Sequence, residues 1–380
     1  MIERSTIVDN QARELVAGTL EASTAEQADV QIRRLVGHVA SRCAMPGVQE
    51  KYAAYSEASA VLAEYPVGPD GFVQSFEPLT EETAFYDHWS RYGVVVSKSA
   101  VNPVARQGAI ARVHSAVSEL SSGSCDLDKP ETYDNLPLDA AGVPILTRGF
   151  FELYHDDALA QLRQSVGAYI HHVLIWGRHD LWTTFDRYGV KLPEHAESAA
   201  LPLHVDQNPR IHPHFRTVQG VLALDDCPIE RGTLVVAPGS KERFSEYGAM
   251  ALGSGAYVEL DTEQPVAGIL QKYAQPMPIR AGDLASWDSR TTHANTANLS
   301  SRTRYIALVS AGPSRPQDAA AVTARAETFR TGIGSNVRDA LMHASKKPRY
   351  ENQEALHSIR RPEQLTALGR LVYGIEPYRS

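Results

Sequence analysis

Residues 217–226 read TVQGVLALDD, and residues 231–240 read RGTLVVAPGS. Each segment is a short run rich in β-branched and aliphatic residues that ends in the turn-forming residues aspartate, proline or glycine. The same texture extends over residues 201–311, where more β-favouring runs follow with turn signals between them. These further runs are residues 257–260, 277–279, 284–287 and 304–310. Short strands spaced in this way predict an all-β sandwich or barrel in this part of the chain.

Helical patterns lie on both sides of the β-rich region. Apolar residues recur at helical spacing over residues 25–44, and Pro46-Gly47 ends that run. We expect further helices over residues 53–64, 106–120, 156–176, 318–330 and 362–371, a capped helix from Thr80, and a short strand over 94–96. The sequence therefore predicts an α+β protein with a β core wrapped by helices from both ends.

The chain divides into three expected parts. Residues 1–70 form a helical extension, residues 71–315 form the main domain with a helical insert, and residues 316–380 form a helical segment that packs on the core. Tyr65 to Pro78 is rich in proline and glycine, which is typical of a linker between the first two parts.

Composition excludes several classes of protein. Hydrophobic residues make up 43% and charged residues 22% of the 380 residues, which is typical of a globular protein and excludes wholesale disorder. The net charge of −8 argues against a nucleic-acid or anionic-membrane partner. No apolar run reaches the roughly 18–20 residues of a membrane span, and the N-terminus lacks a signal-peptide pattern.

The three cysteines, Cys43, Cys125 and Cys227, are odd in number and widely separated. They exclude a disulfide scaffold and a CxxC-type zinc site, and they fit a reducing compartment. We therefore expect a cytoplasmic protein whose partner is a small molecule rather than a nucleic acid or a membrane. No feature of the sequence indicates an oligomeric state.

His204-Val205-Asp206 stands near the start of the β-rich region. On an extended strand the side chains of residues i and i+2 point to the same face, so this imidazole and this carboxylate converge. They supply two ligands of a 2-His-1-carboxylate site for non-haem Fe(II). The motif alone is weak evidence, because about 0.7 such matches are expected by chance. Indeed, His155-Asp156-Asp157 matches too, at an expected helix start where an aspartate more often caps the helix.

The downstream sequence strengthens the first match. Residues 282–293 read GDLASWDSRTTH, which is an expected strand followed by a histidine. His293 would supply the third ligand from a distant strand. Arg304 follows eleven residues later, inside another expected strand. Its guanidinium offers a bidentate clamp for the distal carboxylate of a 2-oxo dicarboxylic acid.

This ordered set resembles the phytanoyl-CoA dioxygenase-like branch of the Fe(II)/2-oxoglutarate oxygenases. The resemblance covers about a third of the chain, from about residue 180 to residue 312. It rests on His204-Val205-Asp206, ALDD at 223–226, RGTLVVAPGS at 231–240, Gly282-Asp283, and His293 with Arg304. Lys241 departs from the family, which often has histidine after Pro-Gly-Ser. The resemblance implies a double-stranded β-helix, or jelly-roll, core with the metal inside one mouth.

The resemblance also implies roles for single residues. His204, Asp206 and His293 would hold Fe(II). Arg304 would pair with the C5 carboxylate of 2-oxoglutarate, and Arg302, which has the same strand parity, is the fallback for that salt bridge.

Other residues have two possible roles each. Asn295 would hydrogen-bond the cosubstrate or simply close a turn. Gln219 would contact cosubstrate or substrate, or it is a buried side chain satisfied by the backbone. His212-Pro213-His214 resembles a cupin motif but lacks the glutamate that should follow. The candidate substrate-binding residues are Trp182, Arg187, Arg210 and His212.

The function implied is a dioxygenase that uses Fe(II), 2-oxoglutarate and O2 to oxidise a C–H bond of a small polar metabolite or natural-product intermediate. 2-Oxoglutarate would be decarboxylated to succinate and CO2. Halogenating relatives carry a small residue in place of the carboxylate ligand, so Asp206 implies hydroxylation, or another oxidation, without halogen transfer. Two alternatives remain: a non-enzymatic jelly-roll binding protein with a vestigial metal site, and a cupin-type iron dioxygenase that uses no keto acid.

Overall fold

Two antiparallel sheets form the centre of the molecule. The computed structural model describes residues 6–138, 142–251, 253, 255, 257–332 and 362–378. The larger sheet has the order β1 (Val94–Ser97), β10 (Leu284–Asp288), β6 (Val218–Ala223), β12 (Arg304–Leu308), β4 (Tyr188–Lys191), β2 (Phe150–Phe151). The smaller has the order β8 (Val258–Glu259), β5 (Leu201–Val205), β11 (His293–Asn295), β7 (Leu234–Val236), β9 (Gln275–Met277). This is the expected double-stranded β-helix, and the α+β prediction is confirmed. A two-stranded sheet pairs β13 (Ala311–Pro313) with β3 (Leu181–Thr183).

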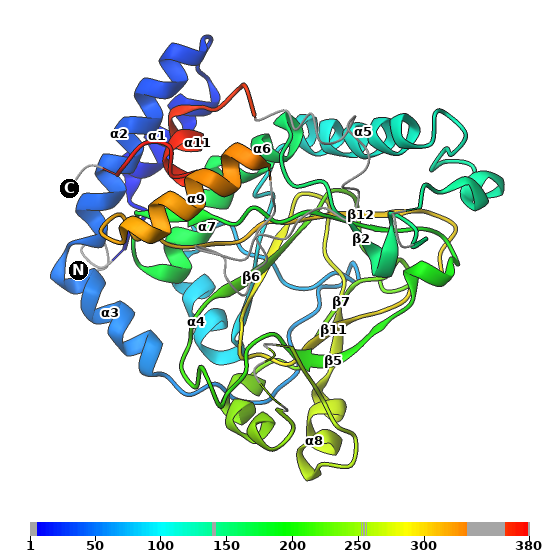
Figure 1. The fold of residues 1–380 in the computed structure, drawn as a ribbon. Helices are drawn as coiled ribbons and strands as arrows, with labels where there is room; N and C mark the ends of the chain where they lie inside the picture. Colours follow the sequence, from blue (N-terminus) through cyan, green and yellow to red (C-terminus); the bar gives the residue numbers. More distant parts are fainter. Residues whose placement is uncertain are drawn as a thin grey trace.

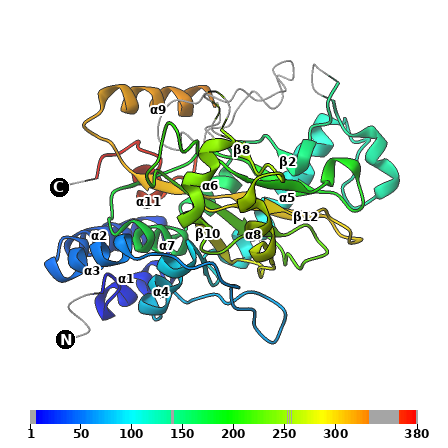
Figure 2. The same ribbon diagram turned by 90° about the horizontal axis from the view of Figure 1, so that it is seen from below.

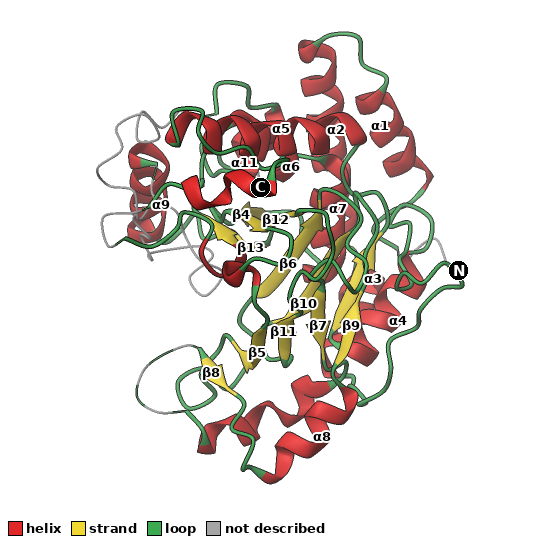
Figure 3. Cartoon of the chain, turned by 90° about the vertical axis from the view of Figure 1, so that its right-hand side faces the viewer, coloured by secondary structure: helices red, strands yellow, loops and turns green. Residues whose placement is uncertain are grey.

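Helices cover the sheets on several sides. They are α1 (Asn10–Leu20), α2 (Ala25–Cys43), α3 (Pro46–Glu57), α4 (Glu82–Tyr92), α5 (Pro103–Leu120), α6 (Asp157–Arg163), α7 (Val166–Trp176), α8 (Pro265–Tyr273), α9 (Ala319–Thr331) and α11 (Ala367–Val372). Among the described residues, short 3-10 helices lie at η2 (Pro130–Asn135), η3 (Thr147–Gly149), η4 (Ala196–Ser198) and η5 (Ser240–Ala249). Helices α1 to α4 and α7 gather on one side of the strands (Figures 1 and 2). Figure 3 shows the strands between a group that includes α2, α5 and α11 and, on the opposite side, α8.

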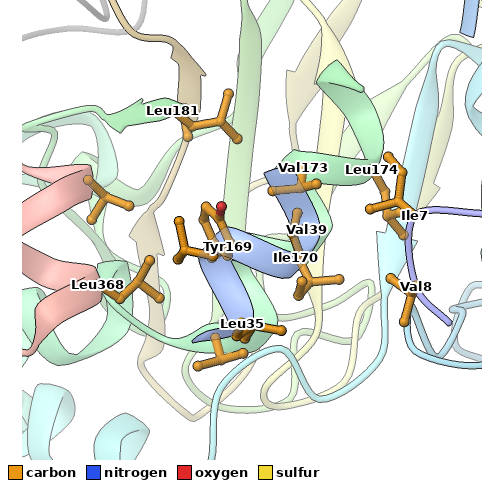
Figure 4. Close-up of a cluster of buried hydrophobic side chains, with 14 of the residues drawn as sticks. Ile7, Val8, Leu35, Val39, Tyr169, Ile170, Val173, Leu174, Leu181 and Leu368 are labelled. Carbon is orange, nitrogen blue, oxygen red and sulfur yellow. The ribbon is translucent and has the colours of Figure 1, made fainter. Parts of the chain in front are cut away.

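The largest hydrophobic cluster joins segments from both ends of the chain. Helix α2 buries one apolar stripe that includes Leu35 and Val39. This stripe packs in one cluster with Tyr169 and Ile170 of α7 and with Leu368 of α11 (Figure 4). The three-part division of the chain stays a prediction, but its expected N-terminal extension shares this core with the rest of the fold. Among the helices of the described residues, none has both the length and the apolar character that a membrane span requires.

The single helix expected over residues 156–176 is wrong, because the helix is interrupted between the end of α6 at Arg163 and the start of α7 at Val166. Ser165 donates its hydroxyl to the carbonyl oxygen of Ala100 at 2.6 Å. A Cβ at Gly167 would lie only 2.5 Å from the same oxygen, so the start of α7 sits directly against this backbone. The cap expected at the start of the first helix is confirmed: Asp156 accepts a hydrogen bond from the amide of Leu159 at 2.7 Å.

The helix expected over residues 53–64 is also wrong beyond Glu57, where α3 ends. Backbone donors that a helix would use internally are taken by distant partners. The amide of Ala60 donates to the carboxylate of Glu242 at 2.9 Å, and the amide of Val61 donates to the carbonyl of Arg91 at 3.1 Å. Tertiary hydrogen bonds therefore override the alanine-rich composition of this segment.

Two other helix starts differ from the expected ones. Helix α4 has Glu81 as its N-cap residue without a side-chain cap, since that carboxylate accepts from the amide of Glu77. The helix expected from residue 362 begins at Ala367, where Thr366 caps it by accepting from the amide of Gly369. Residues 333–361 of the expected C-terminal segment lie outside the described residues.

Two histidines of α7 predict an acid-sensitive fold. His171 and His172 are fully buried, and burial lowers the pKa of both, that of His172 to about 4. Because these folded-state pKa values lie below the unfolded value near 6.5, the stability they provide is present above pH 6.5 and is lost as pH falls. We expect His172 alone to cost about 2–3 kcal/mol of unfolding free energy between pH 7 and pH 4.5, as measured by urea denaturation.

The variant His172→Leu is the control for this prediction. In the wild type, Nδ1 of His172 lies 2.8 Å from the carbonyl oxygen of Ala168 in the same helix, and Nε2 has no hydrogen-bond partner among the described residues. Leucine at position 172 therefore removes the titrating group and leaves no residue outside α7 without its hydrogen bond. If wild type and variant lost the same free energy of unfolding as the pH falls, His172 would not be the cause of the acid sensitivity.

Candidate metal centre

The two histidines and the aspartate of the expected triad meet in the structure. His293 of β11 stands directly opposite His204 of β5 in the antiparallel ladder, and Asp206 follows β5 by one residue. The Oδ2 atom of Asp206 lies 3.6 Å from Nε2 of His293 and 3.9 Å from Nε2 of His204. Three ligand atoms around one ion at about 2.1 Å lie roughly 3–4 Å apart, so these atoms are already near ligating positions.

Backbone carbonyls fix which imidazole nitrogen faces the centre. Nδ1 of His204 lies 2.8 Å from the carbonyl oxygen of Pro202, and Nδ1 of His293 lies 3.0 Å from that of Thr291. A carbonyl only accepts, so each Nδ1 carries a proton, and each Nε2 faces Asp206 as the nitrogen that would bind a metal. Two imidazoles that bind through Nε2 and one carboxylate are the donor set of mononuclear non-haem Fe(II), so the residues present fit that ion.

The larger sheet supplies a second layer of contacts to Asp206. Trp287 of β10 donates its indole N–H to Oε1 of Gln219, its direct neighbour on β6, at 2.9 Å. Because an indole only donates, the amide oxygen of Gln219 must face Trp287 and its Nε2 must face the carboxylate. Nε2 donates to Oδ2 of Asp206 at 2.8 Å. The alternative in which the backbone satisfies Gln219 is therefore wrong.

A cavity of about 200 Å³ opens between the two sheets. The triad, Gln219 and Trp287 line it, together with Asn295 and Arg304. Aliphatic side chains make up about half of the rest of its wall, which also includes the charged residues Arg148, Asp186 and Arg187. One cavity thus holds both the candidate metal ligands and the candidate anchor of a cosubstrate.

Arg304 is a buried cation without a counter-charge. Its Nη1 donates to the carbonyl of Gly232 at 2.6 Å, and its Nε has no partner. Within the described part of the chain no carboxylate contacts it, and burial lowers its pKa to about 10. An unpaired buried cation that lines a cavity is suited to an anionic ligand. The fallback, Arg302, is wrong: its side chain is 70% exposed and pairs with Asp225.

Asn295 lies on strand β11, so the turn-closing alternative is wrong. Its Oδ1 accepts from the amide of Leu201 at 3.3 Å and from Nζ of Lys191 at 2.6 Å. Lys191, on β4, was missed by the sequence reasoning. The signal that could have found it is a lysine inside the otherwise apolar run that ends at Leu192.

The candidate substrate-binding residues differ in whether they line the cavity. Arg187 lines the cavity, where its guanidinium donates to Glu152 at 3.1 Å and stacks 4.8 Å from the ring of Phe150. Its role toward a substrate stays a prediction. Trp182 does not line the cavity; it packs against Ala321, with the guanidinium of Arg325 5.2 Å from its ring.

Arg210 and His212 also lie outside the cavity lining. Arg210 is exposed and donates to the carbonyl of Gly248. The carbonyl of His212 accepts a hydrogen bond from the side-chain amide of Gln207 at 2.6 Å. Sequence reasoning missed Tyr257, whose ring centroid lies 4.6 Å from that of His204.

A second group with metal-ligand chemistry lies on the surface. It comprises His114, Asp126 and Asp128. Asp126 is already paired with Lys129 at 2.8 Å, and His114 shares a hydrogen bond with the hydroxyl of Tyr305. These competing partners make it a poorer metal site than the triad.

Comparisons with known proteins agree with the fold. The family described as Phytanoyl-CoA dioxygenase (PhyH) matches residues 146–306. The "Ava biosynthesis cluster protein O" of Aspergillus versicolor is 22% identical over an alignment of 253 residues that covers 63% of this chain and 80% of that protein. A hypothetical protein of Escherichia coli, crystallised at high pH, is 14% identical over 97% of this chain and 98% of its own, with a TM-score of 0.55. That likeness shows the fold along nearly the whole chain.

Another solved structure is the epimerase SnoN in complex with Fe3+, alpha ketoglutarate and nogalamycin RO. It is 16% identical, covers 70% of this chain and 94% of its own, and has a TM-score of 0.44. A likeness at that level adds nothing to the fold or to the roles of single residues.

Proposed function

We propose that this chain, whose residues 146–306 match the phytanoyl-CoA dioxygenase family, is an Fe(II)/2-oxoglutarate-dependent oxygenase that hydroxylates a C–H bond of a small molecule. The observation that carries the proposal is one cavity lined by two metal-facing imidazoles, one carboxylate and an unpaired buried guanidinium. His204, Asp206 and His293 would hold Fe(II), and Arg304 would bind the distal carboxylate of 2-oxoglutarate. Bound Fe(II) supplies the oxidising chemistry: substrate, O2 and 2-oxoglutarate give hydroxylated product, succinate and CO2.

The chain's own residues bind, orient and shield the reactants. One carboxylate and two neutral imidazoles leave a divalent ion with net positive charge, which attracts the 2-oxo acid end of the cosubstrate. Arg304 neutralises the other end, and this fixes the orientation of the cosubstrate in the cavity. The aliphatic part of the wall limits water near the reacting atoms.

The retained carboxylate supports hydroxylation over halogen transfer. Asp206 occupies the third protein position, and Gln219 holds its Oδ2 by a 2.8 Å hydrogen bond. A halide would need that position. Arg187 at the cavity wall, and the biosynthetic-cluster name of the Aspergillus relative, favour a polar natural-product intermediate as substrate.

The cellular setting is part of the proposal. Cys43, Cys125 and Cys227 are all free and buried, which fits a reducing cytoplasm. The partner we propose is a small molecule rather than a nucleic acid or a membrane.

The test of the function is turnover of the cosubstrate. Protein reconstituted with Fe(II) should form succinate from 2-oxoglutarate under air, and omission of Fe(II) or O2 should stop it. Replacing chloride by sulfate in the buffer should leave the rate unchanged. Absence of succinate would favour the binding-protein alternative, whereas O2 consumption without the keto acid would favour a cupin-type dioxygenase.

A further inference from the structure

A second buried basic side chain lies beside Arg304. Lys191 of β4 stands directly opposite Arg304 of β12 in the antiparallel ladder, so the two side chains leave the sheet on the same face. Lys191 is 0% exposed and Arg304 is 5% exposed. A lysine with no exposure at all is rare unless it is paired.

The partners of Lys191 carry no charge. Its Nζ lies 2.8 Å from the carbonyl oxygen of Ala199, 2.6 Å from that of Thr296 and 2.6 Å from Oδ1 of Asn295. A neutral amine can donate to two of these three acceptors, whereas an ammonium group donates to all three. Within the described residues no carboxylate contacts either Lys191 or Arg304. Burial, followed by the charge of Arg304, lowers the pKa of Lys191 to about 6. Two neighbouring basic side chains without an anion are suited to a ligand that brings negative charge, because that charge offsets the cost of a second buried cation.

The fold makes room for this lysine. Gly149 and Gly232 have positive φ angles of +75° and +84°. A Cβ at Gly149 would lie 2.8 Å from Cγ of Lys191, and a Cβ at Gly232 would lie 3.0 Å from its Cδ. The aliphatic stem therefore passes between two glycines, and this passage carries the amine to Asn295.

The lysine sets the orientation of the Asn295 amide. The amide of Leu201 can only donate, and it donates to the same Oδ1 as Lys191 does. The oxygen of Asn295 therefore faces these two donors, and its Nδ2 is turned away from them. Nδ2 makes no hydrogen bond to the described residues, and Asn295 and Arg304 line one cavity.

We propose that Lys191 is a positioning residue for the distal carboxylate of 2-oxoglutarate: it holds Asn295 so that Nδ2 donates to that carboxylate beside Arg304, and it takes up a proton when the dianion binds. This inference rests on the proposed function. The physical reason is that a negative charge beside Arg304 offsets the repulsion that disfavours the ammonium form of Lys191. The proton comes from the buffer, so binding and protonation are linked.

Other charged groups near Lys191 do not account for such a proton. Arg148 of η3 and Glu194 beyond β4 are exposed, and Arg231, which precedes Gly232, is paired with Asp225 at 2.8 Å. Cys227 lies near Arg304, and burial raises the pKa of its thiol to about 11, so it is already protonated at neutral pH. Metal loading keeps the two ligand histidines deprotonated throughout.

The test is calorimetric titration of 2-oxoglutarate into the Fe(II)-loaded protein without O2. Titrations at pH 7.5 in phosphate and in Tris, which differ in ionisation enthalpy, count the protons exchanged. Wild type should take up between about half and one proton per 2-oxoglutarate, and its affinity should fall as pH rises from 6.5 to 8.5. Pyruvate, which has the keto acid but no distal carboxylate, should bind without proton uptake.

Three variants complete the experiment. Lys191→Met should lose the proton uptake and bind 2-oxoglutarate about tenfold more weakly, with Fe(II) affinity unchanged. Asn295→Ala should bind more weakly yet keep the proton uptake. Lys272→Met, at an exposed site at the end of α8, should match wild type.

The outcomes separate this inference from the proposed function. If wild type binds 2-oxoglutarate without proton uptake, or if Asn295→Ala binds it as tightly as wild type, Lys191 only fills space and the inference is overturned. Neither the proton uptake of wild type nor the affinity of Asn295→Ala depends on Lys191→Met, so both can be measured even if that variant fails to fold. If wild type with Fe(II) does not bind 2-oxoglutarate at all, the proposed function itself fails.

Discussion

Replacing Arg304 with alanine should weaken 2-oxoglutarate binding by at least about 100-fold while Fe(II) affinity stays within about twofold of wild type. Hydrogen bonds between charged groups contribute about 1.5–3 kcal/mol each, and a guanidinium can make two of them to one carboxylate. Arg304 makes its one hydrogen bond to Gly232, so alanine removes no contact to the triad. Calorimetry without O2, with Fe(II) and 2-oxoglutarate titrated separately, measures both affinities.

Arg302→Ala is the matched control. It removes the same charge two residues earlier in the chain, but the Arg302 side chain is exposed and bound to Asp225. Its 2-oxoglutarate affinity should equal that of wild type. The opposite pattern, with loss of binding in Arg302→Ala and none in Arg304→Ala, would mean that the cosubstrate lies in a different orientation.

The metal ligands could be predicted from the sequence because their geometry is local. An i, i+2 pair on a strand converges wherever that strand lies, so His204 and Asp206 share a target in almost any fold. The position of His293 depends on the pairing of β11 with β5, which no local pattern reveals. The order of motifs along the chain, through the family resemblance, supplied it.

Residues that act through tertiary contacts could not be predicted in this way. Nothing near Lys191 in the sequence shows that Ala199 and Asn295 will surround its amine. Conversely, Trp182 and His212 are close to the triad in sequence but lie outside the cavity, because nearness along the chain does not decide which way a loop turns.

The same limit explains the errors in secondary structure. The segment after Glu57 has helical composition, yet Ala60 and Val61 use their amides on Glu242 and Arg91. The break at Ser165 depends on Ala100, which is far away in sequence. Strand predictions fared better, since alternation on a buried sheet is a property of the strand itself.

Replacing Asp206 with alanine should lower Fe(II) affinity by at least about 100-fold. The variant loses one of three ligands and also the negative charge that balances the ion, and changes in the outer contacts of a metal site alone cost about 10–100-fold. Asp157→Ala, in the other His-x-Asp match of the sequence, should bind Fe(II) like wild type, because Asp157 accepts its hydrogen bonds from backbone amides near residue 363. Fe(II) titration without O2 measures the three affinities.

The variant Trp287→Phe tests the hydrogen bonds that run from Trp287 through Gln219 to the Asp206 carboxylate. Phenylalanine fills much of the same space but cannot donate, so Oε1 of Gln219 loses the hydrogen bond that holds the amide in place. A less firmly held Nε2 donor supports the Asp206 carboxylate less well, and we expect Fe(II) affinity to fall about tenfold, a smaller loss than in Asp206→Ala. Equal affinity in Trp287→Phe and wild type would show that the amide orientation is fixed by something other than the indole, and that the carboxylate alone positions the ion.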